Sequence, residues 1–233
     1  MPPEAAPFSM AVPVGRCART GCGAGQLEGR IAMKLYYLPN ACSLASNIAL
    51  REAGLKFELV KVDRKTKIAA DGLNFREVNP KGYVPALTLD SGETLTENVA
   101  VLQYIADRNP AARLAPAFGT IERYRLMEWL SYINSEIHKP FGALFRADAP
   151  EGAKEFSRNN LTPRLDYAQT ALGSKNYLMG EYTVADAYLF TVLGWGARVD
   201  VDIGNWPGLK RLHERVGARP HTVEALKSEG LLK

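Results

Sequence analysis

The sequence predicts a mixed α/β domain followed by an all-α domain. Between residues 33 and 110, short runs of strand-forming residues alternate with amphipathic segments in the order βαβαββα. Beyond residue 120 strand signals largely vanish, and apolar residues recur at spacings of three and four, which is typical of helices. The predicted boundaries are 33–112 for the α/β domain, 113–119 for a linker and 120–233 for the all-α domain.

The α/β domain opens with a strand, a helix and a second strand. Residues 34–38 and 57–62 are short runs rich in strand formers. The segment 43–53 between them has apolar side chains on one face, and Gly54 after it is a natural helix stop. This βαβ unit predicts two parallel strands joined by a right-handed crossover.

A hairpin and a closing helix complete this domain. The charged stretch 63–75 predicts a short helix. Residues 84–89 and 93–96 predict two strands that turn around an Asp-Ser-Gly sequence. A helix follows, beginning at Glu97 or Asn98 and stopping before an Asn-Pro pair. Together with the βαβ unit, these elements have the thioredoxin-like order.

The all-α domain is predicted to contain a series of amphipathic helices. Pro140 predicts that the first of them ends at His138 and Lys139, because a residue before proline disfavours helical geometry. Thr183 and Asp186 have the spacing of an N-terminal capping box, which we interpret as purely structural. The predicted helices cover 121–137, 154–171, 184–199, 208–217 and 221–227.

The composition is that of an ordinary globular protein. Of the 233 residues, 46% are hydrophobic and 23% are charged, which is enough apolar material for a core. No apolar run approaches the roughly 18 residues that span a bilayer. The 29 basic and 25 acidic residues form no basic block, so neither a membrane nor a nucleic acid is an expected partner.

The three cysteines predict neither a disulfide framework nor a metal site. Cys17 and Cys22 lie in residues 1–32, a segment rich in Pro, Ala and Gly that predicts a disordered extension, or an upstream start ahead of Met33. Three is an odd number for disulfides, and none of the three histidines is near a cysteine in sequence. The sequence therefore predicts no metal and a reduced, cytoplasmic protein.

Cys42 is the candidate reactive residue. It lies between the first strand and the first helix, where backbone N–H groups and the helix dipole stabilise an anion, so the pKa of its thiol is predicted to fall. The alternative is a small buried apolar residue. Ala45 stands where a Cys-x-x-Cys motif has its second thiol, so a disulfide of Cys42 needs an external thiol such as glutathione to resolve it.

Two other segments predict contacts to a peptide-like ligand. The Val84–Pro85 bond opens a strand, and in the thioredoxin-like arrangement it is cis and exposes the backbone of Val84 to an extended peptide. A trans proline at a strand start is the alternative. Glu97 and Asn98 lie at a helix start, where N–H groups bind carboxylates and the acid binds an ammonium group. This clamp fits a γ-glutamyl head, although Asn98 also suits an ordinary N-cap.

Five short motifs carry a family resemblance: MKLYYLPNACSLAS at 33–46, VNPKGYVPAL at 78–87, LTE at 95–97, EIHK at 136–139 and ADAYLFTV at 185–192. With these motifs, residues 33–233 resemble the beta-class bacterial glutathione S-transferases. The resemblance implies the glutathione transferase fold, glutathione as co-substrate, and a homodimer with two glutathione sites near the subunit interface.

The resemblance also implies roles for individual residues. Cys42 faces or bonds to the glutathione sulfur, and His138 lies beside it. Without the family, His138 and Lys139 are explained as cations that favour a helix C-terminus. The other implied glutathione contacts are Tyr37 near the site, Val84 at the cysteinyl backbone, Glu97 and Asn98 at the γ-glutamyl head, Lys67 and Lys139 at the glycyl or sulfur end, and Ser131 and Ser135 from the partner subunit.

These implications predict an enzyme that presents the glutathione thiolate, or a mixed disulfide with it, to a small hydrophobic electrophile. Conjugation, thiol–disulfide exchange and peroxide reduction are the predicted reactions. One alternative is a glutathione-dependent isomerase or reductive dehalogenase on the same scaffold. Another is a non-catalytic binding protein with this fold, since function belongs to sites rather than folds. The presence of Cys42, Glu97 and His138 favours the enzyme.

Overall fold

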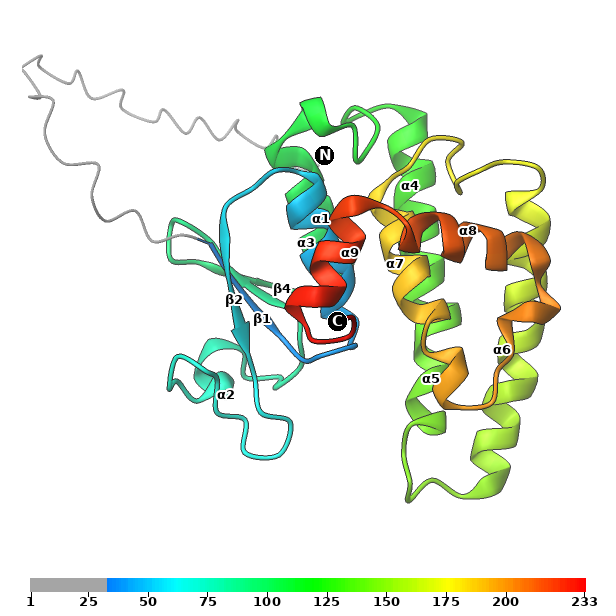
Figure 1. The fold of residues 1–233 in the computed structure, drawn as a ribbon, viewed down its shortest axis with the longest axis horizontal. Coiled ribbons are helices and arrows are strands. Elements are labelled where there is room, and N and C mark those ends of the chain that lie inside the picture. The colour runs from blue at the N-terminus through cyan, green and yellow to red at the C-terminus, as the bar shows by residue number, and fades with distance from the viewer. Residues whose placement is uncertain (1–32) are drawn as a thin grey trace, which may run out of the picture. The chain divides into compact units, whose positions relative to one another are not determined.

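The computed structural model describes residues 33–233. The predicted N-terminal extension, with Cys17 and Cys22, lies outside the described residues. Within them a small mixed sheet is followed by a series of helices (Figure 1). This arrangement confirms the predicted order of an α/β domain before an all-α domain.

Four strands form the sheet, in the order β2-β1-β3-β4. β1 pairs with β2 in parallel, and β3 runs antiparallel to both β1 and β4. Successive side chains of a strand face opposite sides, so Leu35 packs in the larger core under the helices, whereas Tyr36 packs in a smaller cluster with Phe75. The elements of this domain are β1 (Met33–Tyr37), α1 (Ser43–Glu52), β2 (Phe57–Lys61), α2 (Phe75–Val78), β3 (Ala86–Thr88), β4 (Thr94–Thr96) and α3 (Asn98–Arg108), followed by the 3-10 helix η1 (Pro110–Ala112).

The segment after β2 differs from its prediction. Residues 63–74 form turns rather than a helix. Asp63 Oδ1 accepts hydrogen bonds from the backbone N–H groups of Lys65 at 2.9 Å and Thr66 at 2.7 Å. Such local side-chain bonds compete with helical pairing. The four-residue helix α2 begins only after Asn74, whose side chain caps it.

Helix α1 joins the sheet to the all-α domain. It packs against α3 of its own domain and against α7 and α9, which come from the C-terminal half of the chain (Figure 1). The elements of the all-α domain are α4 (Ile121–Tyr132), the π-helix η2 (Ile133–His138), α5 (Lys139–Leu144), α6 (Glu151–Leu172), α7 (Val184–Leu193), the 3-10 helices η3 (Gly196–Arg198) and η4 (Ile203–Asn205), α8 (Pro207–Gly217) and α9 (Pro220–Ser228).

The first helix of the all-α domain continues past Pro140, contrary to the prediction. α4 leads through the π-helical turn η2 directly into α5. Proline has no N–H group and is tolerated in the first turn of a helix, which is its place in α5. His138 and Lys139 therefore lie within a continuous helical segment, and their interpretation as helix-end cations is wrong. π-turns inside helices are frequent at functional sites.

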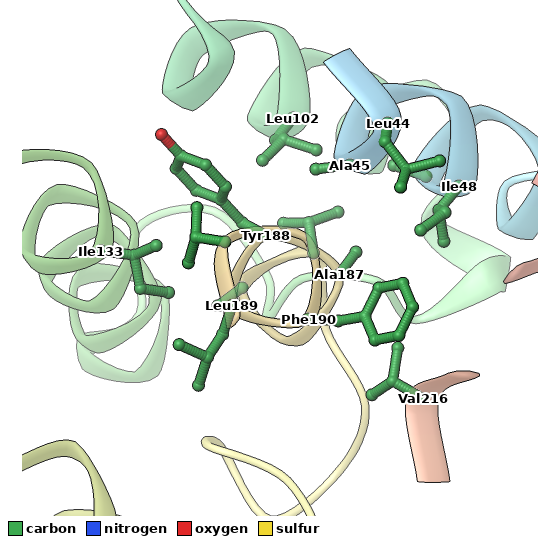
Figure 2. Packing of buried hydrophobic residues seen from close by; sticks show 14 of the residues in the cluster. Leu44, Ala45, Ile48, Leu102, Ile133, Ala187, Tyr188, Leu189, Phe190 and Val216 are labelled. Carbon is green, nitrogen blue, oxygen red and sulfur yellow. The ribbon is translucent and has the colours of Figure 1, made fainter. Parts of the chain in front are cut away.

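Helix α7 is the centre of the core, and every residue in it is buried. Figure 2 shows Tyr188 extending from α7 between Leu102 and Ile133, while Phe190 points toward Val216. The ring of Tyr188 is fully buried, so its hydroxyl needs hydrogen-bond partners inside the protein.

Asp186 fixes the start of α7 and confirms the predicted capping box. Its Oδ2 accepts from the backbone N–H of Thr183 at 2.8 Å, and its Oδ1 accepts from the backbone N–H of Leu178 at 2.8 Å. The carboxyl group is fully buried, and burial raises its pKa to about 6. Two backbone donors that water cannot reach therefore depend on this one side chain.

Replacing Asp186 by Ala is expected to lower the free energy of unfolding by about 2–4 kcal/mol, because it leaves buried N–H groups unpaired at a helix start. Urea or guanidinium unfolding measures the change. Asp148→Ala is the matched control: Asp148 is exposed and paired with Arg146, so its loss is expected to change stability by less than about 0.5 kcal/mol. Equal effects of the two substitutions would contradict the structural role of Asp186.

Candidate functional site

Cys42 lies in the loop between β1 and α1, at the N-cap of α1. Its Sγ donates a hydrogen bond to the backbone oxygen of Val84, 3.2 Å away, on the loop before β3. The Val84–Pro85 peptide bond is cis, as predicted. Two residues that the sequence analysis assigned to one site, 42 positions apart in the chain, are thus in direct contact.

Two side chains from the C-terminal part of the chain hold the Cys42 loop. Trp195 Nε1 donates to the backbone oxygen of Asn40 at 3.0 Å. Glu229 Oε2 accepts from the backbone N–H of Asn40 at 3.0 Å, and its Oε1 accepts from Asn47 Nδ2 at 3.1 Å. Both Trp195 and Glu229 are buried. The position of Cys42 therefore depends on the all-α domain as well as on its own.

The predicted fall in the pKa of Cys42 is wrong for the free protein. Burial raises the pKa of the thiol to about 12. The backbone N–H groups of Cys42 and Ser43 at the start of α1 lower it, but by less than burial raises it. At pH 7 the side chain is a neutral thiol, which agrees with the hydrogen bond that it donates to Val84.

His138 is held by a chain of hydrogen bonds. Its Nδ1 lies 2.7 Å from the hydroxyl of Tyr188, and this hydroxyl donates to Asn134 Oδ1 at 2.9 Å. Because the hydroxyl has one proton to give, its oxygen accepts from the Nδ1–H of His138. Burial lowers the pKa of His138 to about 4, so the ring is neutral at pH 7. Nε2 is then unprotonated and is available as an acceptor.

A cavity of about 600 Å³ has Cys42, Val84 and His138 in its wall. We call it the polar cavity, because most of its other lining residues carry hydrogen-bonding side chains. Glu97 lies at its edge with a φ of 69°, a strained conformation for a non-glycine residue that costs about 1–3 kcal/mol. The remaining lining residues are Asn79, Tyr83, Pro85, Asn98, Asn134, Ser135, Lys139 and Gly142.

Asn98 lines this cavity with a side chain that is only 5% exposed. Its Oδ1 accepts from Ser46 Oγ at 2.7 Å, and its Nδ2 lies buried on the side of the Tyr188 hydroxyl. The interpretation of Asn98 as an N-cap is wrong, because Glu97 occupies the N-cap and Asn98 is the first helical residue of α3. Its backbone N–H therefore stands at a helix start, where N–H groups bind carboxylates.

A second cavity, of about 500 Å³, shares Cys42, Val84 and His138 with the polar cavity. We call it the aromatic cavity. The ring of Trp195 lies 5.5 Å from that of Phe141 and 5.7 Å from that of Phe145, measured between centroids. The other lining residues are Leu38, Asn40, Ala41, Arg64, Lys67, Gly82, Tyr83, Gly142 and Arg198. The thiol of Cys42 and the ring of His138 therefore stand where the polar cavity and the aromatic cavity meet.

Most of the predicted site residues line one or both cavities. Tyr37 and Ser131 line neither. Tyr37 is buried, and burial, followed by the Glu229 carboxylate, raises the pKa of its hydroxyl. Ser131 is exposed on α4. The predicted residues that do line a cavity are Cys42, Lys67, Val84, Glu97, Asn98, Ser135, His138 and Lys139.

Four aromatic residues of the site were not predicted from the sequence. Phe141 and Phe145 follow His138 by three and seven positions, which puts them on one helical face only if the helix continues past Pro140. Tyr188 and Trp195 carry no local signal, because large aromatic residues near a buried helix are usually core.

Residues 33–233 contain neither a candidate membrane span nor a candidate metal cluster. No helix in this range is both long enough and apolar enough to span a bilayer. In the same range, His, Cys, Asp and Glu side chains do not gather in groups of three that could hold a metal ion.

The N-terminal domain model of the glutathione S-transferases matches residues 31–107, and their C-terminal domain model matches residues 128–220. The chain belongs to the glutathione S-transferase family. Glutathione S-transferase GstA of Escherichia coli O157:H7 is 46% identical over 200 residues, which cover 85% of this chain and 100% of that one. The predicted family and enzyme class are thus confirmed.

Solved structures of family members agree with the fold. The bacterial beta-class glutathione S-transferase of Sphingomonas chungbukensis is 48% identical, with a TM-score of 0.83 over 85% of this chain and 100% of that one. A sphingomonad glutathione S-transferase, solved in complex with glutathione, is 47% identical, with the same TM-score and the same coverage. The predicted beta-class resemblance and glutathione transferase fold are confirmed.

The thiol of Cys42 is expected to react slowly with iodoacetamide at pH 7, and its alkylation rate is expected to rise about tenfold per pH unit up to pH 10. The reason is that burial disfavours the thiolate, so below a pKa of about 12 the reactive fraction grows with each unit of pH. Intact-mass measurement on a Cys17→Ser, Cys22→Ser chain isolates this one thiol. Free cysteine under the same conditions levels off near its ordinary pKa of about 8.5. A Cys42 rate that is already level at pH 8 would contradict the raised pKa.

Proposed function

We propose that this protein binds glutathione in the polar cavity and transfers its thiol to an electrophile held in the aromatic cavity. The observation that carries the proposal is the junction of the two cavities at Cys42, Val84 and His138. A tripeptide with a charged head fits the polar chamber, and an apolar electrophile fits the aromatic one. The sulfur of the one then meets the reactive carbon of the other.

The polar cavity offers groups that match each part of glutathione. The carbonyl and N–H groups of Val84 are suited to pair with the cysteinyl backbone, as in strand addition. Glu97 is suited to the γ-glutamyl ammonium group, in exchange for its present partner Lys81. The backbone N–H of Asn98, at the start of α3, is suited to the γ-glutamyl carboxylate. Lys67, on the loop after β2, lines the adjoining aromatic cavity and is suited to the glycyl carboxylate, because its Nζ contacts only the backbone oxygen of Gly82 within residues 33–233.

In conjugation, the glutathione sulfur is the nucleophile. When glutathione binds, the S–H of Cys42 turns from the Val84 oxygen to the glutathione thiolate and stabilises it, and Nε2 of His138 accepts the proton that the glutathione thiol gives up. A new bond forms between the glutathione sulfur and the electrophilic carbon. The bond from that carbon to its leaving group breaks, and the leaving group takes the electron pair.

A second activity, thiol–disulfide exchange, is favoured by the free thiol of Cys42 at the cavity junction. Cys42 first loses its proton to water, and its thiolate then attacks a disulfide that contains glutathione; one sulfur–sulfur bond forms, the old one breaks, and the displaced sulfur leaves as a thiolate that takes up a proton. A second glutathione thiolate then attacks the mixed disulfide and regenerates Cys42. Ala45 supplies no internal thiol, so the external one is required.

The proposal also includes the domain boundaries, the oligomeric state and the cellular location of the enzyme. The domain boundaries are 33–112 for the glutathione-binding domain, 113–119 for the linker and 120–233 for the electrophile domain. The active form is a homodimer, and the reduced thiol chemistry belongs in the cytoplasm. Tyr37 does not contact the ligand, because it is buried and lines neither cavity.

Cys42→Ala is expected to abolish thiol transfer and the glutathione adduct seen by intact mass, and to lower conjugation of 1-chloro-2,4-dinitrobenzene without abolishing it. Only exchange needs a covalent bond to Cys42, whereas conjugation loses one hydrogen-bond donor. The Cys17→Ser, Cys22→Ser chain is the control and is expected to retain both activities. Calorimetry measures glutathione binding in each variant. Absence of glutathione binding to the wild type, or full thiol transfer by Cys42→Ala, would contradict the proposal.

Sedimentation at micromolar concentration is expected to give twice the monomer mass of 25.6 kDa. Ser131 and Ser135 lie four residues apart on one exposed helical face, which suits contact with a partner's glutathione site. Ser131→Arg is expected to weaken the dimer at least about tenfold by burying an unpaired charge. Ser174→Arg, at an exposed position outside both cavities, is the control. A fully active wild-type monomer would contradict the dimer.

A further inference from the structure

The charged side chains of the aromatic cavity are all basic. Among residues 33–233, Arg64, Lys67 and Arg198 line it, and no aspartate or glutamate does. Lys67 is assigned to glutathione, which leaves Arg64 and Arg198 as cations that a neutral electrophile does not require. We propose that the preferred electrophile is an aromatic compound that carries an acidic group, a carboxylate or a sulfonate, and that Arg198 binds this group. This inference rests on the proposed function, because it names the substrate class of the same site.

An aromatic cluster forms one wall of this cavity. Trp195 stands edge-on to both Phe141 and Phe145, with interplanar angles of 81° and 76°, and the two phenylalanine rings are stacked at 26°. Phe141 and Trp195 are buried, whereas Phe145 is 41% exposed, so its ring is the one that a planar substrate can contact. Trp195 also contacts His138 at 4.7 Å between centroids, so the cluster packs against the candidate site.

Arg198 is free to bind an anion. Its guanidinium carbon lies 5.4 Å from the centre of the Phe145 ring, so the guanidinium group stands beside this aromatic side chain. Within residues 33–233 it makes no ion pair with a carboxylate. A guanidinium binds a carboxylate or sulfonate through two parallel hydrogen bonds while its face stays on an aromatic ring.

The backbone around Arg198 is built tightly. η3 turns directly out of α7, and the N–H groups of Val199 and Val201 both donate to the oxygen of Gly196, at 3.0 and 3.1 Å. A Cβ at Gly196 would lie 2.4 Å from the backbone oxygen of Val201, so only glycine permits this turn. The turn fixes the backbone from which the exposed side chain of Arg198 reaches the rim of the cavity.

Glutathione does not account for Arg198. Glutathione has two carboxylates, and both are already assigned, to Asn98 and to Lys67, so neither is left for Arg198 on η3. Arg64 lies beside Lys67 on the loop after β2 and adds to the positive field at the mouth of the cavity. The acidic group takes no part in the bond changes: the glutathione sulfur bonds to the ring carbon, and chloride leaves that carbon with the electron pair.

Two electrophiles that differ in one acidic group test the inference. 4-Chloro-3,5-dinitrobenzoate carries a carboxylate, and 1-chloro-2,4-dinitrobenzene does not. The quantity compared is the ratio of kcat/KM for the acidic to the neutral compound. Arg198→Ala is expected to lower this ratio about tenfold, at the lower end for a charged hydrogen bond because Arg198 is exposed. Arg211→Ala, the same charge change at an exposed site outside the aromatic cavity, is expected to leave the ratio unchanged.

The conjugation measurements separate a failure of the proposed function from a failure of the role given to Arg198. A wild type that conjugates neither compound contradicts the proposed function itself. A wild type that conjugates the neutral compound, with an equal ratio in Arg198→Ala, overturns the assignment of Arg198. An equal loss in Arg198→Ala and Arg211→Ala reduces the effect to net charge and also overturns it. Arg198→Lys separates charge from geometry, and partial recovery of the ratio is the expected result.

Discussion

The packing of helix α1 is the constraint on which the rest of the site depends. Its residues from Ser43 to Leu50 are all buried, between the sheet on one side and α3, α7 and α9 on the others. A helix enclosed in this way cannot shift without disturbing both domains. Because Cys42 is at its N-terminus, the thiol is fixed against groups that come from the all-α domain, above all Trp195 and His138. The active-site junction is therefore a by-product of how the two domains share one helix.

Much of the fold was readable in the sequence because its signals are local. The βαβ unit, the hairpin and the capping box of Asp186 depend on spacing, turn residues and helix starts within a dozen positions. Two predictions of local structure were wrong, at Pro140 and at Asp63, because a feature outside the simple residue pattern determines the backbone there. Pro140 is a helix breaker by local rules, yet the π-turn before it lets the helix continue. After β2, the side chain of Asp63 accepts hydrogen bonds from nearby backbone N–H groups, and the chain forms turns where a helix was predicted.

The site was less readable than the fold for a related reason. Motifs located Cys42, Val84, Glu97 and His138, but ionisation states follow from burial, which the sequence does not give. The helix start at Cys42 favours an anion, and its burial opposes this more strongly. His138 is neutral for the same reason. The free site is therefore an uncharged pair, a thiol that donates and an imidazole that accepts.

The protonated state of Cys42 has a consequence for the survival of the protein. Oxidation by peroxide begins at the thiolate and proceeds through sulfenic acid to forms that cells cannot repair. A thiol that donates its proton to Val84, with a pKa raised to about 12, offers little thiolate to such an attack. The free protein is therefore expected to resist peroxide at Cys42.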